Sequence, residues 1–253
     1  MKILYFIILM FGFASARSQQ WAPVGALWVY DVSQGSPLIL TYIKSEKDTV
    51  VAGKECRLMA IRNISRMMNP NGTYYIDTSL VSKESIYNSN DTVYHYDRSL
   101  KVFYPLYLMN VQKSDTIIVR PGNPGCSNNS CVRFEYVVDS LTSCKLNDQE
   151  LKVIYNAATN KSEWVFNRSG ISENYPVIER IGSVKYFFGV SKIVIMEGTV
   201  LRLRCYTDNI ITYKDAAFTG DCNSLFQPSL SGAKTSKLEI DKMIYPNPFK
   251  RLF

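Results

Sequence analysis

The chain has 253 residues and a net charge of +7, and 46% of its residues are hydrophobic and 13% aromatic. This composition is typical of a folded protein and excludes an intrinsically disordered chain. Its 29 lysines and arginines are spread along the sequence without a long basic block or a recognisable nucleic-acid-binding module. A nucleic-acid partner is therefore not expected.

The first residues have the pattern of an export signal. Lys2 gives a positive start, residues 3–13 are an unbroken apolar run, and residues 14–16 read Ala-Ser-Ala, a small-x-small cleavage site. The run is shorter than the roughly 20 residues of a membrane-spanning helix. The first cysteine is Cys56, so a lipoprotein anchor is not expected. We predict a signal peptide over residues 1–16 and a mature chain without a transmembrane segment.

Residues 47–59 have the pattern of a strand, a tight turn and a returning strand. The β-branched run at residues 49–51 favours extended backbone, and Gly53 supplies the positive φ that a two-residue hairpin needs. The Asp-Thr opening of this segment recurs in residues 90–94 and 114–118. We therefore expect hairpins of this kind to be the building unit of the fold.

The other hydrophobic runs predict further short strands separated by turn residues. They cover residues 28–30, 38–43, 73–76, 84–87, 92–96, 102–109 and 116–119. Residues 69–72 read Asn-Pro-Asn-Gly and predict a turn, and Pro105 places its strand at an edge or a break. Residues 120–125 are the strongest loop and the best candidate for an internal boundary.

The second half of the chain alternates apolar and polar positions more regularly. The alternation is clear in residues 134–138, 151–155 and 201–206, and no apolar stripe has helical spacing for more than about two turns. We predict one all-β domain over residues 17–226. The expected architecture is an antiparallel meander that forms a β-sandwich or a strongly curved, partly closed sheet.

Six cysteines in an exported chain predict disulfide bonds. Proximity favours bridges between Cys126 and Cys131 and between Cys205 and Cys222. Cys56 and Cys144 would then be left for a long-range bridge. A zinc site is the alternative, but the chain has no CxxC pair and its one histidine is not spaced to complete a cysteine cluster. No metal or cofactor is expected.

His95, the only histidine, is the first residue to test for catalysis. It lies between Tyr94 and Tyr96, and strand alternation places it on one face with Val93 and Asp97. No Gly-x-Ser-x-Gly elbow accompanies it. We interpret His95 as structural and assign no catalytic residue.

Carboxylate pairs are the second catalytic pattern that we considered, because a glycoside hydrolase needs two acids across the scissile bond. Glu163, Glu173 and Glu179 are the acids nearest to aromatic residues, and Glu163 precedes Trp164. A chain with 22 acidic residues offers such pairs by chance. Glu179 and Arg180 are interpreted as a surface or cross-strand ion pair.

Aromatic residues suggest a carbohydrate-binding surface, because sugar rings stack on aromatic faces. Trp28 and Trp164 lie within regular strand patterns and are interpreted as core residues. Trp21 and Tyr175 lie near a loop or a terminus. They are the candidates for an exposed platform that binds a glycan.

Several short motifs together resemble those of a group of secreted β-rich proteins of Bacteroidota. The motifs are Trp28-x-Tyr30, Gly53-Lys54-x-Cys56, residues 163–166 (Glu-Trp-Val-Phe), 178–183 (Ile-Glu-Arg-Ile-Gly-Ser), 186–189 (Tyr-Phe-Phe-Gly) and 203–206 (Leu-Arg-Cys-Tyr). Proteins of this group typically end in a type IX secretion C-terminal sorting domain. The resemblance covers most of the mature chain and implies a secreted β-rich fold, but its motifs are structural and name no chemistry.

The C-terminal tail carries the most telling part of the resemblance. Its sorting motif would be Tyr245, Pro246, Asn247, Pro248 and Phe249. Residues 227–242 resemble the linker that precedes such a domain, and residues 243–253 would be its truncated start. The alternative is that Tyr-Pro-Asn-Pro is only a turn.

These observations together predict a secreted or cell-surface protein that is not an enzyme and whose ligand is unknown. The type IX secretion machinery is the expected partner if the tail is functional, and the periplasm is the expected location if it is not. One alternative is a glycan-binding module with a polysaccharide partner. The other is a glycoside hydrolase that uses a carboxylate pair.

The export prediction can be tested by the intact mass of the protein from the native organism's envelope and medium. We expect a mass that starts near Arg17 and lacks the residues after the linker. A periplasmic protein that retains Phe253 would show that the tail does not sort.

Overall fold

The computed structural model describes residues 21–32, 39–119, 134–158, 175–185, 187–188, 201–216, 218 and 220–223. The predicted signal peptide, the 120–125 loop, Cys126, Cys131, Glu163, Trp164, Glu173, the linker and the sorting motif lie outside these residues. The described residues contain no helix that is long and apolar enough to cross a membrane.

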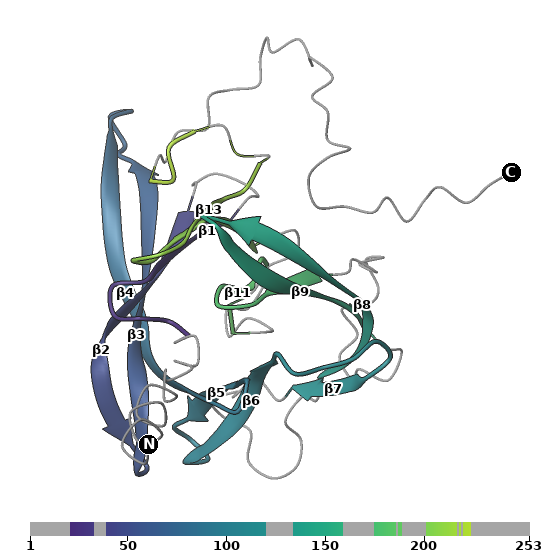
Figure 1. The fold of residues 1–253 in the computed structure, drawn as a ribbon. Helices are drawn as coiled ribbons and strands as arrows, with labels where there is room; N and C mark the ends of the chain where they lie inside the picture. The colour runs from purple at the N-terminus through teal and green to yellow at the C-terminus, as the bar shows by residue number, and fades with distance from the viewer. Residues whose placement is uncertain are drawn as a thin grey trace, which may run out of the picture.

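The described elements are all β-strands, and they form two antiparallel sheets (Figure 1). Sheet A has the order β13 (Thr212–Lys214), β12 (Leu201–Thr207), β1 (Leu27–Val32), β2 (Ile39–Val51), β3 (Lys54–Met68), β4 (Tyr74–Ser89), β5 (Thr92–Asp97) and β6 (Val102–Leu108). Sheet B has the order β11 (Gly182–Ser183), β10 (Tyr175–Ile178), β9 (Gln149–Ala158), β8 (Phe134–Leu146) and β7 (Thr116–Val119). The predicted all-β antiparallel meander is confirmed, with one exception: β12, besides pairing with its neighbour β13, pairs with the distant strand β1.

Sheet A curls strongly into a half-barrel, and sheet B lies across its open side (Figure 1). One hydrophobic cluster contains buried residues of both sheets, among them Trp28 and Tyr206 from sheet A and Leu151 and Ile154 from sheet B. The inner faces of the two sheets therefore bury the apolar surface that neither sheet could cover alone.

The tight hairpin turns follow the predicted chemistry. Ala52 and Gly53 both have positive φ, and Val51 pairs with Lys54 on either side of them. Asn90 and Asp91 make the same turn between β4 and β5. Two positive φ values in succession suit the twist of a two-residue hairpin, and glycine, asparagine and aspartate tolerate them best. The third Asp-Thr segment, residues 114–118, differs, because it follows a loop and leads into β7 without forming such a hairpin.

The alternation predicted for residues 201–206 is wrong. Arg204 and Tyr206, predicted to lie on the polar side of β12, are as buried as Leu203. The register passes from the pair Val29 and Cys205 to the pair Tyr30 and Leu203, so Arg204 is the extra residue of a β-bulge. The buried Arg204 forms an ion pair with Asp31 at 2.7 Å, and its guanidinium stacks against the ring of Phe218.

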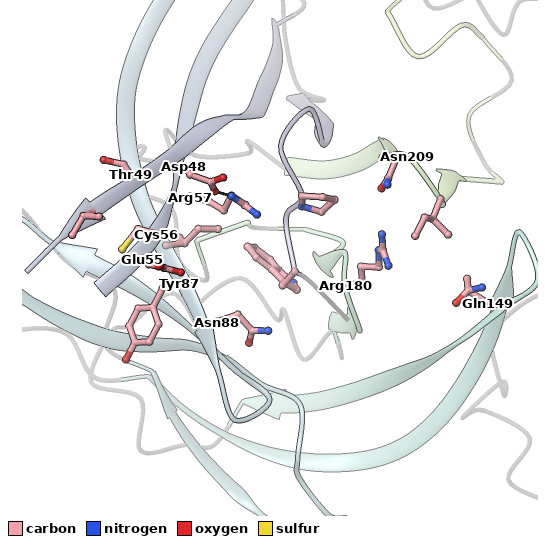
Figure 2. Close-up of a pocket in the computed structure, with 15 residues that line it drawn as sticks. Asp48, Thr49, Glu55, Cys56, Arg57, Tyr87, Asn88, Gln149, Arg180 and Asn209 are labelled. Carbon is pink, nitrogen blue, oxygen red and sulfur yellow. Dashed lines mark ion pairs between the residues drawn. The ribbon is translucent and has the colours of Figure 1, made fainter. Parts of the chain in front are cut away.

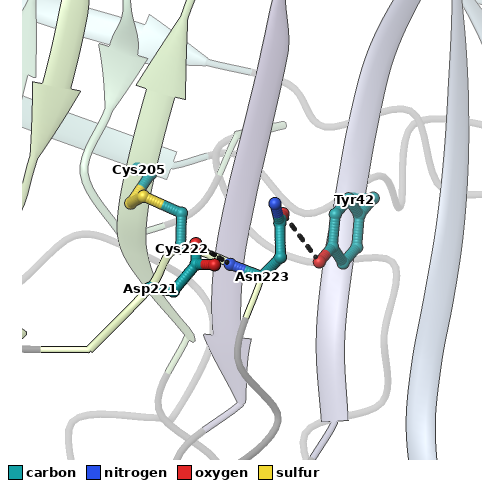
Figure 3. Close-up of a disulfide and its surroundings, with 5 residues drawn as sticks. All are labelled: Tyr42, Cys205, Asp221, Cys222 and Asn223. Carbon is teal, nitrogen blue, oxygen red and sulfur yellow. Dashed lines mark hydrogen bonds between the residues drawn. A yellow bond between two sulfur atoms is a disulfide. The ribbon is translucent and has the colours of Figure 1, made fainter.

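The predicted disulfide between Cys205 and Cys222 is confirmed (Figure 3). It fastens the segment after β13 to the face of sheet A opposite the main core, where Val29 and Leu40 form a second small cluster. Next to the bridge, the hydroxyl of Tyr42 donates to Oδ1 of Asn223 at 3.1 Å.

The predicted bridge between Cys56 and Cys144 is wrong. Both cysteines are unbridged, Cys56 on β3 of sheet A and Cys144 on β8 of sheet B. Each strand is held by local hairpin pairing within its own sheet, and this pairing does not bring the two thiols together. Elimination among six cysteines therefore chose a pair that the topology keeps apart.

Replacement of Cys205 and Cys222 by alanine should lower the melting temperature by roughly 5 to 10 °C, because a bridge that closes a short loop contributes about 3 kcal/mol. Thermal unfolding followed by circular dichroism under non-reducing conditions measures the change. Cys144→Ala, at an unbridged and half-buried cysteine, is the control. Equal melting temperatures for the double variant and the wild type would contradict the role of the bridge.

Candidate functional site

An open pocket lies where the β2–β3 hairpin faces the turns that end β4, β8, β10 and β12. We call it the mouth. Its volume is about 1030 Å³. It is lined by Trp21, Pro23, Asp48, Thr49, Val50, Glu55, Cys56, Arg57, Ile86, Tyr87, Asn88, Gln149, Arg180, Asn209 and Ile210. Figure 2 shows two groups of polar side chains on opposite sides of it, one from the β2–β3 hairpin and one that contains Arg180, Asn209 and Gln149.

The hairpin side of the mouth carries an ion pair between Asp48 and Arg57, which are opposite one another in the β2–β3 register (Figure 2). Burial lowers the pKa of the Arg57 guanidinium. Cys56 lies between Glu55 and Arg57, and burial raises the pKa of its thiol. A raised pKa keeps the thiol protonated, so Cys56 is a poor nucleophile in this position.

The far side of the mouth is built on a buried ion pair between Arg180 and Asp208. Nε of Arg180 donates to Oδ2 of Asp208 at 2.8 Å, and the two side chains are 6% and 0% exposed. The hydroxyl of Tyr206 donates to the same oxygen. The other oxygen, Oδ1, accepts from the backbone N–H groups of Ile210 and Ile211, both at 2.7 Å.

The pKa of Asp208 is lowered by this arrangement. Burial on its own would raise the pKa, but the hydrogen bonds from Tyr206, Arg180 and the two backbone N–H groups stabilise the charged form and outweigh burial. The pKa of Tyr206 is raised, because burial and the hydrogen bond to Asp208 disfavour its ionisation. At neutral pH the Asp208 carboxylate is therefore charged, and the Tyr206 hydroxyl keeps its proton.

The predicted surface ion pair between Glu179 and Arg180 is wrong. Arg180 turns inward to Asp208, and Glu179 accepts the backbone N–H of Lys152 at 3.0 Å. Arg180 has a φ of 69°, so the tight turn between β10 and β11 holds it in the left-handed region. Neighbouring residues in such a turn point apart, which separates the two side chains.

Trp21, predicted to be an exposed glycan contact, is buried. It is 5% exposed, lines the bottom of the mouth and lies against Trp28, Tyr107 and Phe187 at ring-centroid distances of 5.8, 5.8 and 5.5 Å. Its indole Nε1 is buried without a hydrogen-bond partner in the described part of the chain. We predicted exposure because Trp21 lies near the predicted start of the mature chain. Packing its large ring against the core removes apolar surface from water, and the ring is therefore buried.

The other aromatic predictions have different outcomes. Trp28 is confirmed as a core residue, fully buried with its indole N–H donated to the carbonyl of Ile181 at 2.7 Å. Tyr175 is the first residue of β10 and pairs with Asn156, and its side chain lies outside the described residues.

His95 lies away from the mouth in the buried face of sheet A. Val93, His95 and Asp97 are all buried, as strand alternation predicted. Nε2 of His95 contacts Oε2 of Glu84 at 2.9 Å, and both side chains are buried. The sequence prediction missed this pair, although the β4–β5 hairpin offered a signal. The register that pairs Ile86 with His95 places Glu84 on the same face.

Sequence reasoning also missed a row of half-buried aromatic rings on the other face of β4, β5 and β6. Tyr87 and Tyr94 stack at 4.6 Å with an interplanar angle of 9°, and Phe103 meets Tyr87 edge-on at 4.7 Å. The signal was the pairing of Tyr87 with Tyr94 across the predicted hairpin. Because the stacked rings cover one another's faces, this row is not a flat platform for a sugar.

No family model matches the chain, and no significant match occurs among the curated proteins or the solved structures. The chemistry of the mouth must therefore be judged from its own side chains. Among the described residues, no group of three or more histidine, cysteine, aspartate or glutamate side chains could hold a metal ion. The mouth instead offers apolar side chains, two paired arginines, the exposed carboxylate of Glu55 and three amides, Asn88, Gln149 and Asn209.

Asp208 should make the free energy of unfolding depend on pH under acidic conditions. Its folded-state pKa lies below the unfolded value of about 3.9, so its stabilising contribution is complete above roughly pH 4 and is lost as the pH falls through the folded pKa. Asp208→Asn should cost about 3 kcal/mol at pH 7, because it leaves Arg180 buried without a counter-charge.

Urea unfolding from pH 7 to pH 2 measures both effects. The variant should lose less stability between pH 4 and pH 2 than the wild type does. Asp148→Asn, at an exposed carboxylate in the β8–β9 turn, is the matched control. The same acid dependence in the wild type and Asp208→Asn would rule out this role of Asp208.

Proposed function

We propose that this protein is an exported, non-enzymatic binding protein and that the mouth holds its ligand. The observation that carries the proposal is a pocket of about 1030 Å³ that is lined by apolar side chains and by two arginines, each already paired with a carboxylate. Ligand sites typically have a volume of a few hundred to about a thousand Å³, mostly apolar lining and few polar groups.

The charges of the mouth disfavour an anionic ligand, because both of its arginines are paired and the exposed Glu55 adds a carboxylate that has no ion pair among the described residues. Arg57 is paired with Asp48, and Arg180 is paired with Asp208. A paired guanidinium gives little net attraction to an anion, because the neighbouring carboxylate repels it. The apolar side chains of Trp21, Val50, Ile86 and Ile210 would contact the body of the ligand, and the amides would bind its polar end.

The states of the ionisable groups support binding over catalysis. General acid–base catalysis is most efficient with a group whose pKa lies near the working pH. The pKa of Asp208 is lowered, and that of Cys56 is raised. His95 is paired with Glu84 and does not line the mouth.

Export rests on the N-terminal leader and on the resemblance to secreted Bacteroidota proteins with a type IX sorting domain. The disulfide between Cys205 and Cys222 supports it, because such bonds form and persist in oxidising compartments outside the cytosol. We propose the cell surface or the medium as the location, and the type IX machinery as the partner of the tail.

A glycan-binding module is the second candidate, and the rim of the mouth favours it. Asn88, Gln149, Asn209 and the phenol of Tyr87 border the pocket, and amide and hydroxyl groups can pair with sugar hydroxyls. Because Trp21 is buried, these rim groups replace it as the proposed contacts.

Titration with N-phenyl-1-naphthylamine, a neutral apolar fluorophore, tests the proposed site. The wild type should give a saturable rise in fluorescence. Val50→Asp combined with Ile210→Asp should weaken binding at least about tenfold, because loss of apolar contact and a new charge together exceed 1.4 kcal/mol. Val102→Asp, at an exposed apolar residue outside the mouth, is the control.

A panel of neutral polysaccharides in the same assay separates the two candidates. Glycan binding that falls with Asn88→Ala and Gln149→Ala, but not with the exposed control Gln112→Ala, would support the second candidate. Failure of both the fluorophore and the polysaccharides to bind, or binding that no mouth variant changes, would overturn the proposed site.

A further inference from the structure

The longest hairpin of sheet A extends past its neighbours. β3 and β4 pair from Arg57 and Ile86 to Met68 and Tyr74, whereas the described residues of β2 pair with β3 as far as Ser65. On the other side, β5 accompanies β4 only along Ile86–Ser89. Figure 1 shows these strands as a long ladder at one side of the molecule.

One edge of β4 therefore carries backbone groups that pair with no strand in the described part of the chain, over residues 74–85. Near the β5 end of this edge, the Arg98 guanidinium donates to the carbonyl of Lys83 at 2.6 Å. An edge of this length is a ready template for another strand.

From Tyr74 to Val81 all side chains of this edge are exposed, and five of the eight are apolar or aromatic, whereas Lys83 and the buried Glu84 lie toward its β5 end. Ile76 is 65% exposed and Leu80 is 53% exposed, and Tyr74, Tyr75 and Val81 are also exposed. Proteins usually protect such an edge with inward charges, proline or a covering loop. In residues 74–82 the only charge is Asp77, and proline is absent. β4 has one bulge, at Val81, where the β3–β4 pairing passes from Ile61 and Ser82 to Arg62 and Leu80. The stretch from Tyr74 to Leu80 pairs regularly with β3 and is free of this protection, which favours pairing with another strand.

We propose that a second copy of this chain pairs antiparallel with the β4 edge, so that the two curled sheets continue into one another. A two-fold axis perpendicular to the sheet requires one residue of β4 to face its own copy. The sequence around the centre of the edge selects which residue this is.

Thr78 is the residue that best faces its own copy. In that register Ile76 lies opposite Leu80, and Asp77 lies opposite Ser79, whose hydroxyl can donate to the carboxylate. A shift to Asp77 would place two like charges opposite each other, which is destabilising. A shift to Ser79 would place Asp77 opposite Val81 and separate Ile76 from Leu80.

Analytical ultracentrifugation of the full mature chain at about 1 to 100 µM tests the dimer. We expect reversible dimers. Ile76→Lys combined with Leu80→Lys should weaken association more than about tenfold, because two lysines would face each other across the axis. Val24→Lys, at an exposed apolar residue distant in sequence, is the control. A monomeric wild type at every concentration would overturn the proposal.

A cysteine scan tests the register independently. Directly opposite Cα atoms lie about 4.5 to 5.5 Å apart, within the reach of a disulfide, whereas diagonal neighbours lie about 7 to 8 Å apart. Thr78→Cys should therefore form a covalent dimer on mild oxidation, and Asp77→Cys and Ser79→Cys should not. Equal cross-linking at all three positions would contradict the register, and crosslinking at none would contradict the interface.

Discussion

The contact between β1 and the turn before β11 holds the two sheets together. The indole of Trp28 donates to the carbonyl of Ile181, and the hydroxyl of Tyr30 donates to the carbonyl of Ser183, both at 2.7 Å and both buried. Each bond gives a buried backbone carbonyl of sheet B or its turn a side-chain donor from β1 of sheet A. Gly182 lies between these carbonyls with a φ of 90°, and a Cβ there would come within 2.9 Å of the Tyr107 ring. The junction therefore requires glycine at this position, and a side chain would force Tyr107 away from the core.

The mouth follows from this junction. The turn that brings Ile181 under Trp28 also holds Arg180 in the left-handed region and directs its guanidinium to Asp208. Trp21 then lies on Trp28 and forms the base of the pocket. The mouth therefore depends on how sheet B packs on sheet A. One of its ion pairs, between Asp48 and Arg57, lies within the β2–β3 hairpin, and the other joins Arg180 after β10 to Asp208 after β12.

Local chemistry was sufficient to predict much of the fold. The two-residue turn at Gly53, the edge position of Pro105 and the core role of Trp28 follow from residue type and spacing. The bulge at Arg204 was not predictable, because an extra residue in one strand leaves no mark in a short alternating pattern. Arg180, Asp208 and Glu84 were missed for a related reason. Their partners come from segments that only the tertiary structure brings together, or from a hairpin whose faces were not compared.

The position of β12 in sheet A has a consequence for how the chain reaches its folded state. β1, the first of the described strands, has β2 on one side and β12, the last but one of them, on the other. Sheet A therefore cannot be completed until nearly the whole described chain is available. Contacts so distant in sequence form slowly. A chain organised in this way leaves one edge of β1 unpaired until β12 has been made, and sheet A closes where β12 pairs with β1, beside the bridge between Cys205 and Cys222.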